Sequence, residues 1–218
     1  MMRHARPLVT VGLMFAVLVI PHPALAGPPL LCHPFDIGTA RSLPWNGPGW
    51  LDAKPDYHLD GLVADTEALL GPSTPVIVRM ESLRRASLYA SRDAKVAADL
   101  LAHVTATAQR SKAEGRPNAL ALLDAAYVTE ALRQIAAIGG VTRYTDQVSG
   151  IRALLDGKDG QRFMRASLAA APDDPSLEFA AALITAGTDS AAYQRHAERA
   201  RAGAKSDALL AKNLSHIS

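Results

Sequence analysis

The sequence lacks most of the features that normally indicate a particular chemistry. Its 218 residues include a single cysteine, so no disulfide framework can form within the chain and stability must come from packing. Aromatic residues make up only 5% of the chain, and almost no segment alternates apolar and polar residues as a strand would. The chain is instead rich in Ala, Leu and Arg, a composition that suits helices packed through small residues.

Residues 1–26 have the pattern of a secretory signal peptide. Arg3 and Arg6 supply the positive charge, residues 8–20 form the apolar core, and residues 24–26 (Ala-Leu-Ala) form a cleavage site before Gly27. An uncleaved membrane anchor is the alternative, but it needs about 20 apolar residues, and here prolines follow a shorter run. We therefore expect a periplasmic or secreted protein with no membrane span after cleavage.

Removal of this segment also changes the charge balance. The Lys and Arg count falls from 23 to 21 when Arg3 and Arg6 are lost, which equals the 21 Asp and Glu residues. The exported chain is then formally neutral, and no clustered basic stripe remains. Nucleic-acid binding needs a basic surface, so we expect no nucleic-acid partner.

Residues 27–56 differ in composition from the rest of the chain. Proline recurs at six positions, and both tryptophans, Trp45 and Trp50, lie here. Proline prevents a long helix, yet the content of large apolar residues is too high for a solvated linker. We expect an irregular, turn-rich segment that lies along the helical body and buries its large side chains there.

The same segment holds the one cluster that suggests chemistry, Cys32, His33 and Asp36. A metal site could use all three, but adjacent ligands are poorly placed for one tetrahedral ion and no second ligand pair accompanies them. A nucleophilic Cys32 would need a base from elsewhere in the fold, such as His58 or His103. The simplest interpretation is that His33 and Asp36 bond to local backbone. Cys32 itself is a buried small hydrophobe, an intermolecular disulfide partner or a reactive thiol, and burial is the commonest of these roles. We expect no catalytic residue, metal or cofactor.

Residues 57–218 predict an all-helical domain. Apolar residues recur at helical spacing over residues 57–70, 75–91, 93–114, 118–138 and 144–155. Thr74, Asp93 and Asn118 are the expected N-caps, and residues 139–140 (Gly-Gly) end the fourth helix, which is the most apolar and is expected to be central.

The helical spacing also predicts where several polar residues of these helices lie. Arg84 and Arg85 are predicted to lie on a solvated face. His103 lies near the apolar stripe and can pair with Asp99 four residues earlier, which predicts a half-buried histidine with a partner rather than a catalytic one. Glu130 is a surface residue in this interpretation, since an isolated helix glutamate rarely has a catalytic role.

Residues 163–184 resemble the junction between two tetratricopeptide repeats. A helix rich in small residues ends in Asp and Pro, and the next helix begins within a few positions; Ser167, Pro172 and Ala182 occupy positions that match the family's small and terminal residues. Helices over residues 188–202 and 206–217 would form a following pair. The aromatic anchor positions are not filled and no strict 34-residue period occurs. The resemblance implies stacked antiparallel helical hairpins, an α-solenoid that follows the irregular segment.

Such a body would act as a protein-protein interaction or scaffolding module in the bacterial cell envelope. In related repeats a concave groove holds an extended peptide or a partner's helix, so the expected partner is another envelope or secreted protein. Arg195, Arg199 and Arg201, near the C-terminus, could form a basic face for an acidic segment. The alternatives are an enzyme or metal site built on Cys32, His33 and Asp36, and a structural protein that oligomerises through Trp45 and Trp50. The oligomeric state stays open.

Overall fold

The computed structural model describes residues 27–141 and 144–217, and this part of the chain is all-α. It contains no strand; one isolated antiparallel bridge joins Trp45 and Ala53. The expected signal peptide, residues 1–26, lies outside the described residues. No helix in the described ranges is both long and apolar enough to cross a membrane.

The helices follow one another along the chain after residues 27–58, which we call the N-terminal segment. A short 3-10 turn at Leu59–Gly61 leads into the first of them. The α-helices are α1 (Leu62–Leu69), α2 (Val76–Ala90), α3 (Ala94–Ala113), α4 (Ala119–Ala137), α5 (Val148–Leu154), α6 (Gly160–Ala170), α7 (Pro175–Thr185), α8 (Ser190–Gly203) and α9 (Ala208–Asn213). Further 3-10 turns lie at Thr145–Gln147, Ala204–Ser206 and Leu214–Ile217.

Side-chain caps fix several of the helix starts. Asp93 accepts hydrogen bonds from two backbone amides at the start of α3, and Asn118 does the same for α4. Both caps were predicted from the sequence. The prediction for Thr74 was wrong, because Pro75 is the N-cap of α2 and the Thr74 hydroxyl donates instead to the Leu69 carbonyl at the end of α1.

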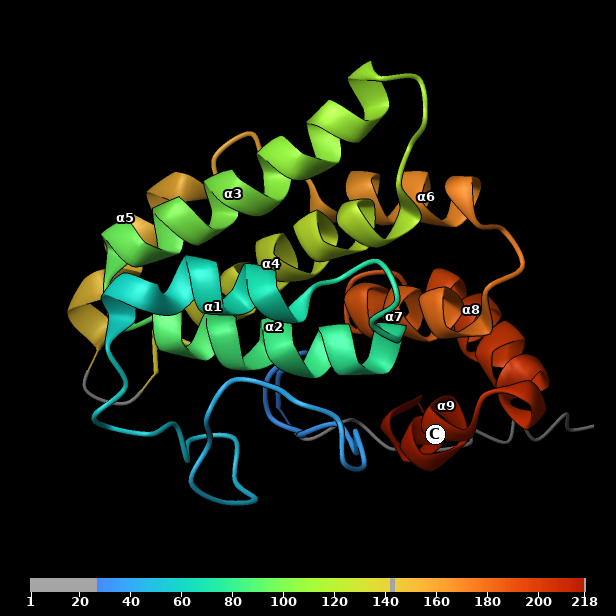
Figure 1. Cartoon of the computed structure of the whole chain (residues 1–218), viewed down its shortest axis with the longest axis horizontal. Helices are drawn as coiled ribbons and strands as arrows, with labels where there is room; N and C mark the ends of the chain where they lie inside the picture. The colour runs from blue at the N-terminus through green and yellow to red at the C-terminus, as the bar shows by residue number, and fades with distance from the viewer. Residues whose placement is uncertain (1–26, 142–143, 218) are drawn as a thin grey trace, which may run out of the picture.

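Helix α4 is central, as its apolar sequence predicted. It packs against α2, α3, α5, α6 and α7. In Figure 1, α3 and α6 lie above α4, whereas α2 and α7 lie below it. The N-terminal segment and α9 form the lowest layer, beneath α2 and α7. Helices α2, α4 and α7 are therefore covered by other elements on both sides.

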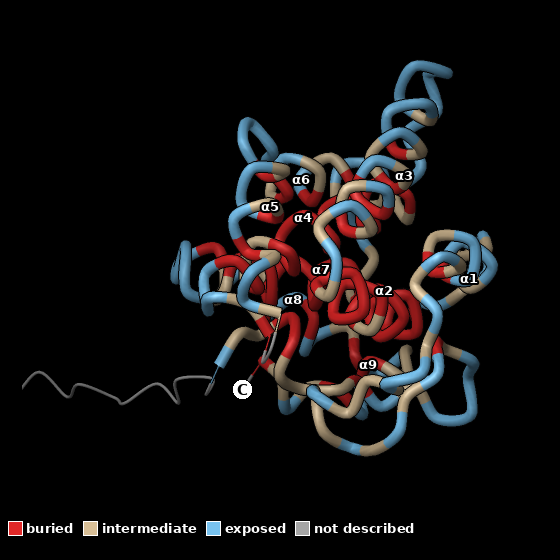
Figure 2. The backbone as a smooth tube through the Cα atoms, turned by 90° about the vertical axis from the view of Figure 1, so that its left-hand side faces the viewer, coloured by how far each residue is buried: buried red, intermediate tan, exposed pale blue. Residues whose placement is uncertain are grey.

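This layering explains why α2, α4 and α7 are buried almost all round. Of the 15 residues of α2, Arg85 alone retains intermediate exposure, and all residues of α7 except Pro175 are buried. Figure 2 shows α2 and α7 as buried tubes enclosed by exposed chain. A helix with a solvated face would alternate between buried and exposed residues. Helix α2 has no such face because the N-terminal segment covers it.

Two predictions for polar residues are wrong: the solvated face for Arg84 and Arg85, and the surface position of Glu130. Arg84 is fully buried, and Arg85 is largely buried. Glu130 is also buried, and its carboxylate accepts a hydrogen bond from the Gly160 amide at the start of α6. His103 is half-buried, as predicted, and its partner is Glu67 on α1, at 3.7 Å.

The junction that resembles a repeat boundary is formed by α6 and α7. Helix α6 ends at Ala170, and α7 begins at Pro175, in the first turn, where the missing proline N–H has no helical partner in any case. Asp174 caps α7 through the amides of Ser176 and Leu177. The Ser167 hydroxyl donates to the Ala119 carbonyl and joins α6 to the start of α4.

Candidate functional site

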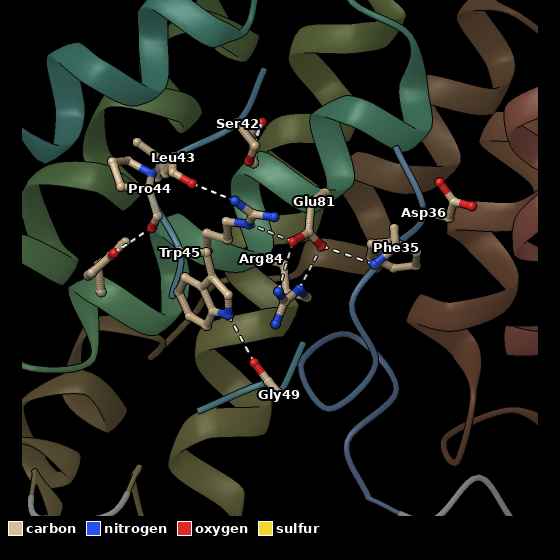
Figure 3. A network of polar contacts seen from close by, with 12 residues as sticks. Phe35, Asp36, Ser42, Leu43, Pro44, Trp45, Gly49, Glu81 and Arg84 are labelled. Atoms are coloured by element: carbon tan, nitrogen blue, oxygen red, sulfur yellow. Dashed lines mark hydrogen bonds and ion pairs between the residues drawn. The ribbon is translucent and has the colours of Figure 1, made fainter. Parts of the chain in front are cut away.

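A buried carboxylate on α2 organises the contact between the helices and the N-terminal segment. Glu81 accepts hydrogen bonds from Arg84 at 2.7 and 2.8 Å and from Arg85 at 2.6 Å. Its third partner is the backbone amide of Phe35, at 3.1 Å. The helical spacing of three and four residues directs both arginines toward the same carboxylate. Figure 3 shows Arg84 pointing to Glu81. Burial alone would raise the pKa of Glu81, but the two guanidinium groups outweigh it and lower the pKa below its ordinary value.

Each arginine also reaches across to the backbone of the N-terminal segment. Arg84 donates to the Leu31 carbonyl at 3.1 Å, and Arg85 donates to the Leu43 carbonyl at 2.6 Å. The Trp45 ring lies over both guanidinium groups, 5.1 and 5.7 Å from their central carbons. The charged cluster therefore fixes the segment at several points along its length.

Two tyrosines extend this pattern at either end of the segment. Tyr89 of α2 donates to the Pro44 carbonyl at 2.6 Å and accepts from the Lys54 amide at 3.0 Å. Tyr127 of α4 donates to the Leu30 carbonyl at 2.7 Å. The Leu30 amide in turn donates to the side chain of Gln134. The helices thus hold this stretch through its backbone, with side chains from α2 and α4.

Apolar side chains of the segment complete the contact. Leu30, Leu31, Phe35 and Leu43 are buried in the same core as the helices. Each large apolar side chain contributes about 1.5–3 kcal/mol when it is removed from water. The faces of α2 and α7 that lie toward the segment are therefore covered by this chain itself.

The structure separates the three residues of the predicted chemical cluster. The Asp36 carboxylate accepts a hydrogen bond from the Gly38 amide and points away from Glu81 in Figure 3. The backbone of Asp36 is held by Asn213 of α9. Among the described residues, no group of three His, Cys, Asp or Glu side chains could hold a metal ion.

Cys32 is partly exposed, and its surroundings do not activate it. Partial burial raises the pKa of the thiol, and the charge of Arg84 opposes this only in part. The thiolate is the nucleophilic form of cysteine, so a raised pKa lowers its reactivity at neutral pH.

His33 lies against His216, which is far from it in the sequence. Its ring packs against that of His216 in the last 3-10 turn, with centroids 5.9 Å apart. His216 also stacks on Phe35, at 4.9 Å. The His33 Nε2 atom is buried and has no hydrogen-bond partner among the described residues. The pair joins the N-terminal segment to the C-terminal turn through ring contacts.

The predicted basic face near the C-terminus is largely engaged within the chain. Arg199 pairs with the buried Glu178 of α7 at 3.0 Å, and His196 contacts the same carboxylate. Arg201 donates to the Ile217 carbonyl. Of the three arginines proposed for this face, Arg195 is the one for which no ion pair or hydrogen bond is observed in the described part of the chain, and it is exposed.

A cavity opens where the N-terminal segment meets the ends of α2 and α4. Its volume is about 310 Å³, and we call it the Trp50 pocket. The walls come from residues 50–55, from the end of α2 and from the loop after α4: Trp50, Leu51, Ala53, Pro55, Leu88, Arg92, Val141 and Tyr144. Leu51, on its rim, is 43% exposed, and it is one of two large hydrophobic residues exposed in the described chain. Periodicity could not predict this pocket because its walls come from three separate segments.

Another, smaller cavity has a volume of about 190 Å³ and is lined by more titratable groups than the Trp50 pocket. Its main charged groups, Arg79 and Asp124, are bound to each other. The carboxylate of Asp124 lines it and is bound through both oxygens by Arg79, at 2.8 Å each. Arg79 also donates to the carbonyls of Leu70 and Gly71. The pair therefore anchors the loop between α1 and α2.

Comparisons of the chain with protein-family models, with curated proteins and with solved structures find no match to it. The function must therefore be inferred from the surface that the structure leaves open.

Proposed function

We propose that the protein is an exported protein-protein interaction or scaffolding module of the bacterial cell envelope. We further propose that its helices form a stack of antiparallel hairpins similar to tetratricopeptide repeats. The packing of the consecutive helices α7 and α8 supports this arrangement, because such a pair would be one hairpin of the stack. Helices α4 and α6 also pack closely, with α5 inserted between them in the chain. The expected partner is another envelope or secreted protein.

The observation that carries the proposal is the Trp50 pocket together with its exposed rim. Ligand sites are concave and lined mostly by apolar side chains, and exposed apolar surface that adjoins such a concavity is typical of an interaction site. Leu51 is exposed at this pocket, and Trp50, Leu88 and Val141 line it. The N-terminal segment fills the inner helical face, so the partner surface lies at this pocket rather than in the expected groove.

The catalytic and metal alternatives have less support. Among the described residues, Cys32, His33 and Asp36 do not form a group that could hold a metal ion. The pKa of the Cys32 thiol is raised, which does not favour the nucleophilic thiolate. A structural protein that oligomerises through the Trp45–Trp50 stretch would use the same surface as a partner protein. The experiment must therefore distinguish a second copy of this chain from a different protein.

Site-specific photo-crosslinking in the cell tests the proposal. A benzophenone amino acid replaces Leu51 in one variant of the full chain and Ala169 in a matched control. Ala169 is exposed at the end of α6, which lies on the opposite side of α4 from the N-terminal segment (Figure 1). We expect one abundant adduct from position 51 and none from position 169.

The adduct's identity decides between the candidate functions. A different envelope protein supports the interaction module, whereas an adduct of twice the chain's own mass supports an oligomerising protein. No adduct from position 51, in a variant that is exported and folded, contradicts the proposal.

A further inference from the structure

Arg92 gives the Trp50 pocket a charge that its apolar walls do not require. The residue lies in the turn after α2 and lines the cavity. Its guanidinium carbon lies 4.8 Å from the Tyr89 ring and 5.9 Å from the Tyr144 ring. One of its N–H groups donates to the Lys54 carbonyl at 3.2 Å. These contacts fix the position of the guanidinium group.

No carboxylate in the described part of the chain forms an ion pair with Arg92. In the segment, Asp56 pairs with Lys54, at 3.4 Å. An arginine carries five N–H donors in a rigid planar fork, and that fork matches the two oxygens of a carboxylate. The pocket therefore combines apolar walls with a positioned donor group for an anion.

We propose that the Trp50 pocket binds the C-terminal residue of a partner polypeptide. The apolar side chain of that residue lies against Trp50, Leu88 and Val141, and its terminal carboxylate is held by Arg92. At about 310 Å³ the cavity is at the small end of ligand pockets, which span roughly 300–1,000 Å³. A C-terminal apolar residue supplies both the apolar group and the carboxylate from one residue, so it satisfies both features in this space. This inference rests on the proposed interaction function and specifies its partner.

Tryptophan indole signals in the NMR spectrum report binding directly. The chain contains two tryptophans, and Trp50→Phe assigns the signal of the pocket residue. The probes are acetylated tetrapeptides Ala-Ala-Ala-X with X = Val, Leu, Ile or Phe, each as a free acid and as a C-terminal amide, and hexanoate as a small apolar carboxylate. We expect saturable shifts of the Trp50 signal with at least one free acid, at a Kd on the order of 0.1–1 mM, and no shift of the Trp45 signal.

The amide form removes the charge but keeps the side chain, so it should bind at least about tenfold more weakly than the acid. Arg92→Gln should abolish this difference, and Arg92→Lys should restore part of it. Arg110→Gln, at an exposed position of α3, is the matched control and should bind like the parent chain. Circular dichroism of each variant establishes that it is folded.

Three results of this titration would overturn the inference. In the first, no free acid causes a saturable shift up to about 10 mM, a concentration beyond which specific binding has little meaning. In the second, acid and amide bind equally. In the third, hexanoate binds as tightly as the peptides, so that a small carboxylate is the ligand. The photo-crosslinking experiment at position 51 adds a fourth such result. A partner that is cross-linked through an internal segment, not its C-terminus, would overturn this inference but would leave the proposed interaction function intact. If no partner is cross-linked, the proposed interaction function itself is wrong.

Discussion

Glu81 accepts hydrogen bonds from two guanidinium groups and one backbone amide without contact with solvent. Such a cluster is favourable only while every member is paired, because a buried charge without a partner is costly. If Glu81 is lost, Arg84 cannot be solvated instead, because its side chain has no access to water. Arg85 keeps partial access to water.

Replacement of Glu81 by alanine should therefore destabilise the protein strongly. Arg84 would stay buried with only the Leu31 carbonyl as partner, and the free energy of unfolding should fall by about 3–5 kcal/mol. Asp99→Ala is the control, because it breaks an exposed pair with Lys95 and should cause no measurable change. Urea unfolding of the two variants gives the comparison. If the free energy of unfolding is the same for Glu81→Ala and Asp99→Ala, the buried cluster does not hold the segment in place.

His216 should make stability depend on pH. Burial, the neighbouring His33 and the charge of Arg84 lower the pKa of His216 to about 4, against the opposing effect of Glu81. The unfolded chain then binds a proton at pH values where the folded chain does not, so stability falls as the pH is lowered from about 6.5 toward 4. Above this window the group has no effect.

The size of this effect should be about 1–2 kcal/mol, once the partial exposure of the ring is allowed for. Urea unfolding at pH 7 and pH 4.5 measures it. His216→Phe should reduce the loss of stability at low pH, whereas His58→Asn, at an exposed residue, should leave it unchanged. If the parent chain and His216→Phe lose the same free energy of unfolding between pH 7 and pH 4.5, His216 does not have this role.

At the scale of elements, the approach of α6 to α4 depends on Gly160. A Cβ atom at this position would lie 2.9 Å from the Ala126 carbonyl oxygen and 2.5 Å from a Glu130 carboxylate oxygen. Neither the α4 backbone nor the buried Glu130 can easily move away. The glycine at the first position of α6 is therefore required by packing.

Gly160→Ala should lower the free energy of unfolding by about 1–3 kcal/mol, although alanine is otherwise the better helix former. Gly71→Ala provides the control, because its added Cβ would meet only the Thr74 hydroxyl, at an ordinary 3.6 Å. Thermal unfolding of both variants tests the difference. A Gly160→Ala protein as stable as the parent would show that α6 can shift freely on α4.

The helices were predictable from the sequence because their signals are local. Apolar spacing predicted α2, α3 and α4 to within a few residues, and Asp93 and Asn118 marked two of the starts. The same spacing failed for the charges of α2. It assumes that a helix has one solvated face, and it assigned Arg84 and Arg85 to that face.

The missing information was the position of the N-terminal segment. Its hydrogen bonds with α2, α4 and α9 join residues 35 to 177 positions apart, such as Lys54 with Tyr89 and Asp36 with Asn213. No periodic pattern records contacts between segments so distant in the chain. The Trp50 pocket was not predictable for the same reason.

At the scale of the whole molecule, the N-terminal segment changes where a partner can bind. The inner faces of α2 and α7 are covered by residues 27–58, and α9 extends the same layer (Figure 1). The open apolar surface lies at the junction of that segment with the helices. The interaction proposal thus depends on the segment staying in place in the folded protein.

Amide hydrogen exchange in the intact protein tests this central claim most directly. The amides of Leu30, Phe35 and Lys54 each donate to a helix side chain. If the segment leaves only when the whole molecule unfolds, these three amides should exchange as slowly as those in the core of α4, near Tyr127. The amide of the exposed Thr39 serves as the fast reference. Exchange of all three at the rate of Thr39, while α4 stays protected, would mean that the segment detaches and leaves the inner face free, which contradicts the account.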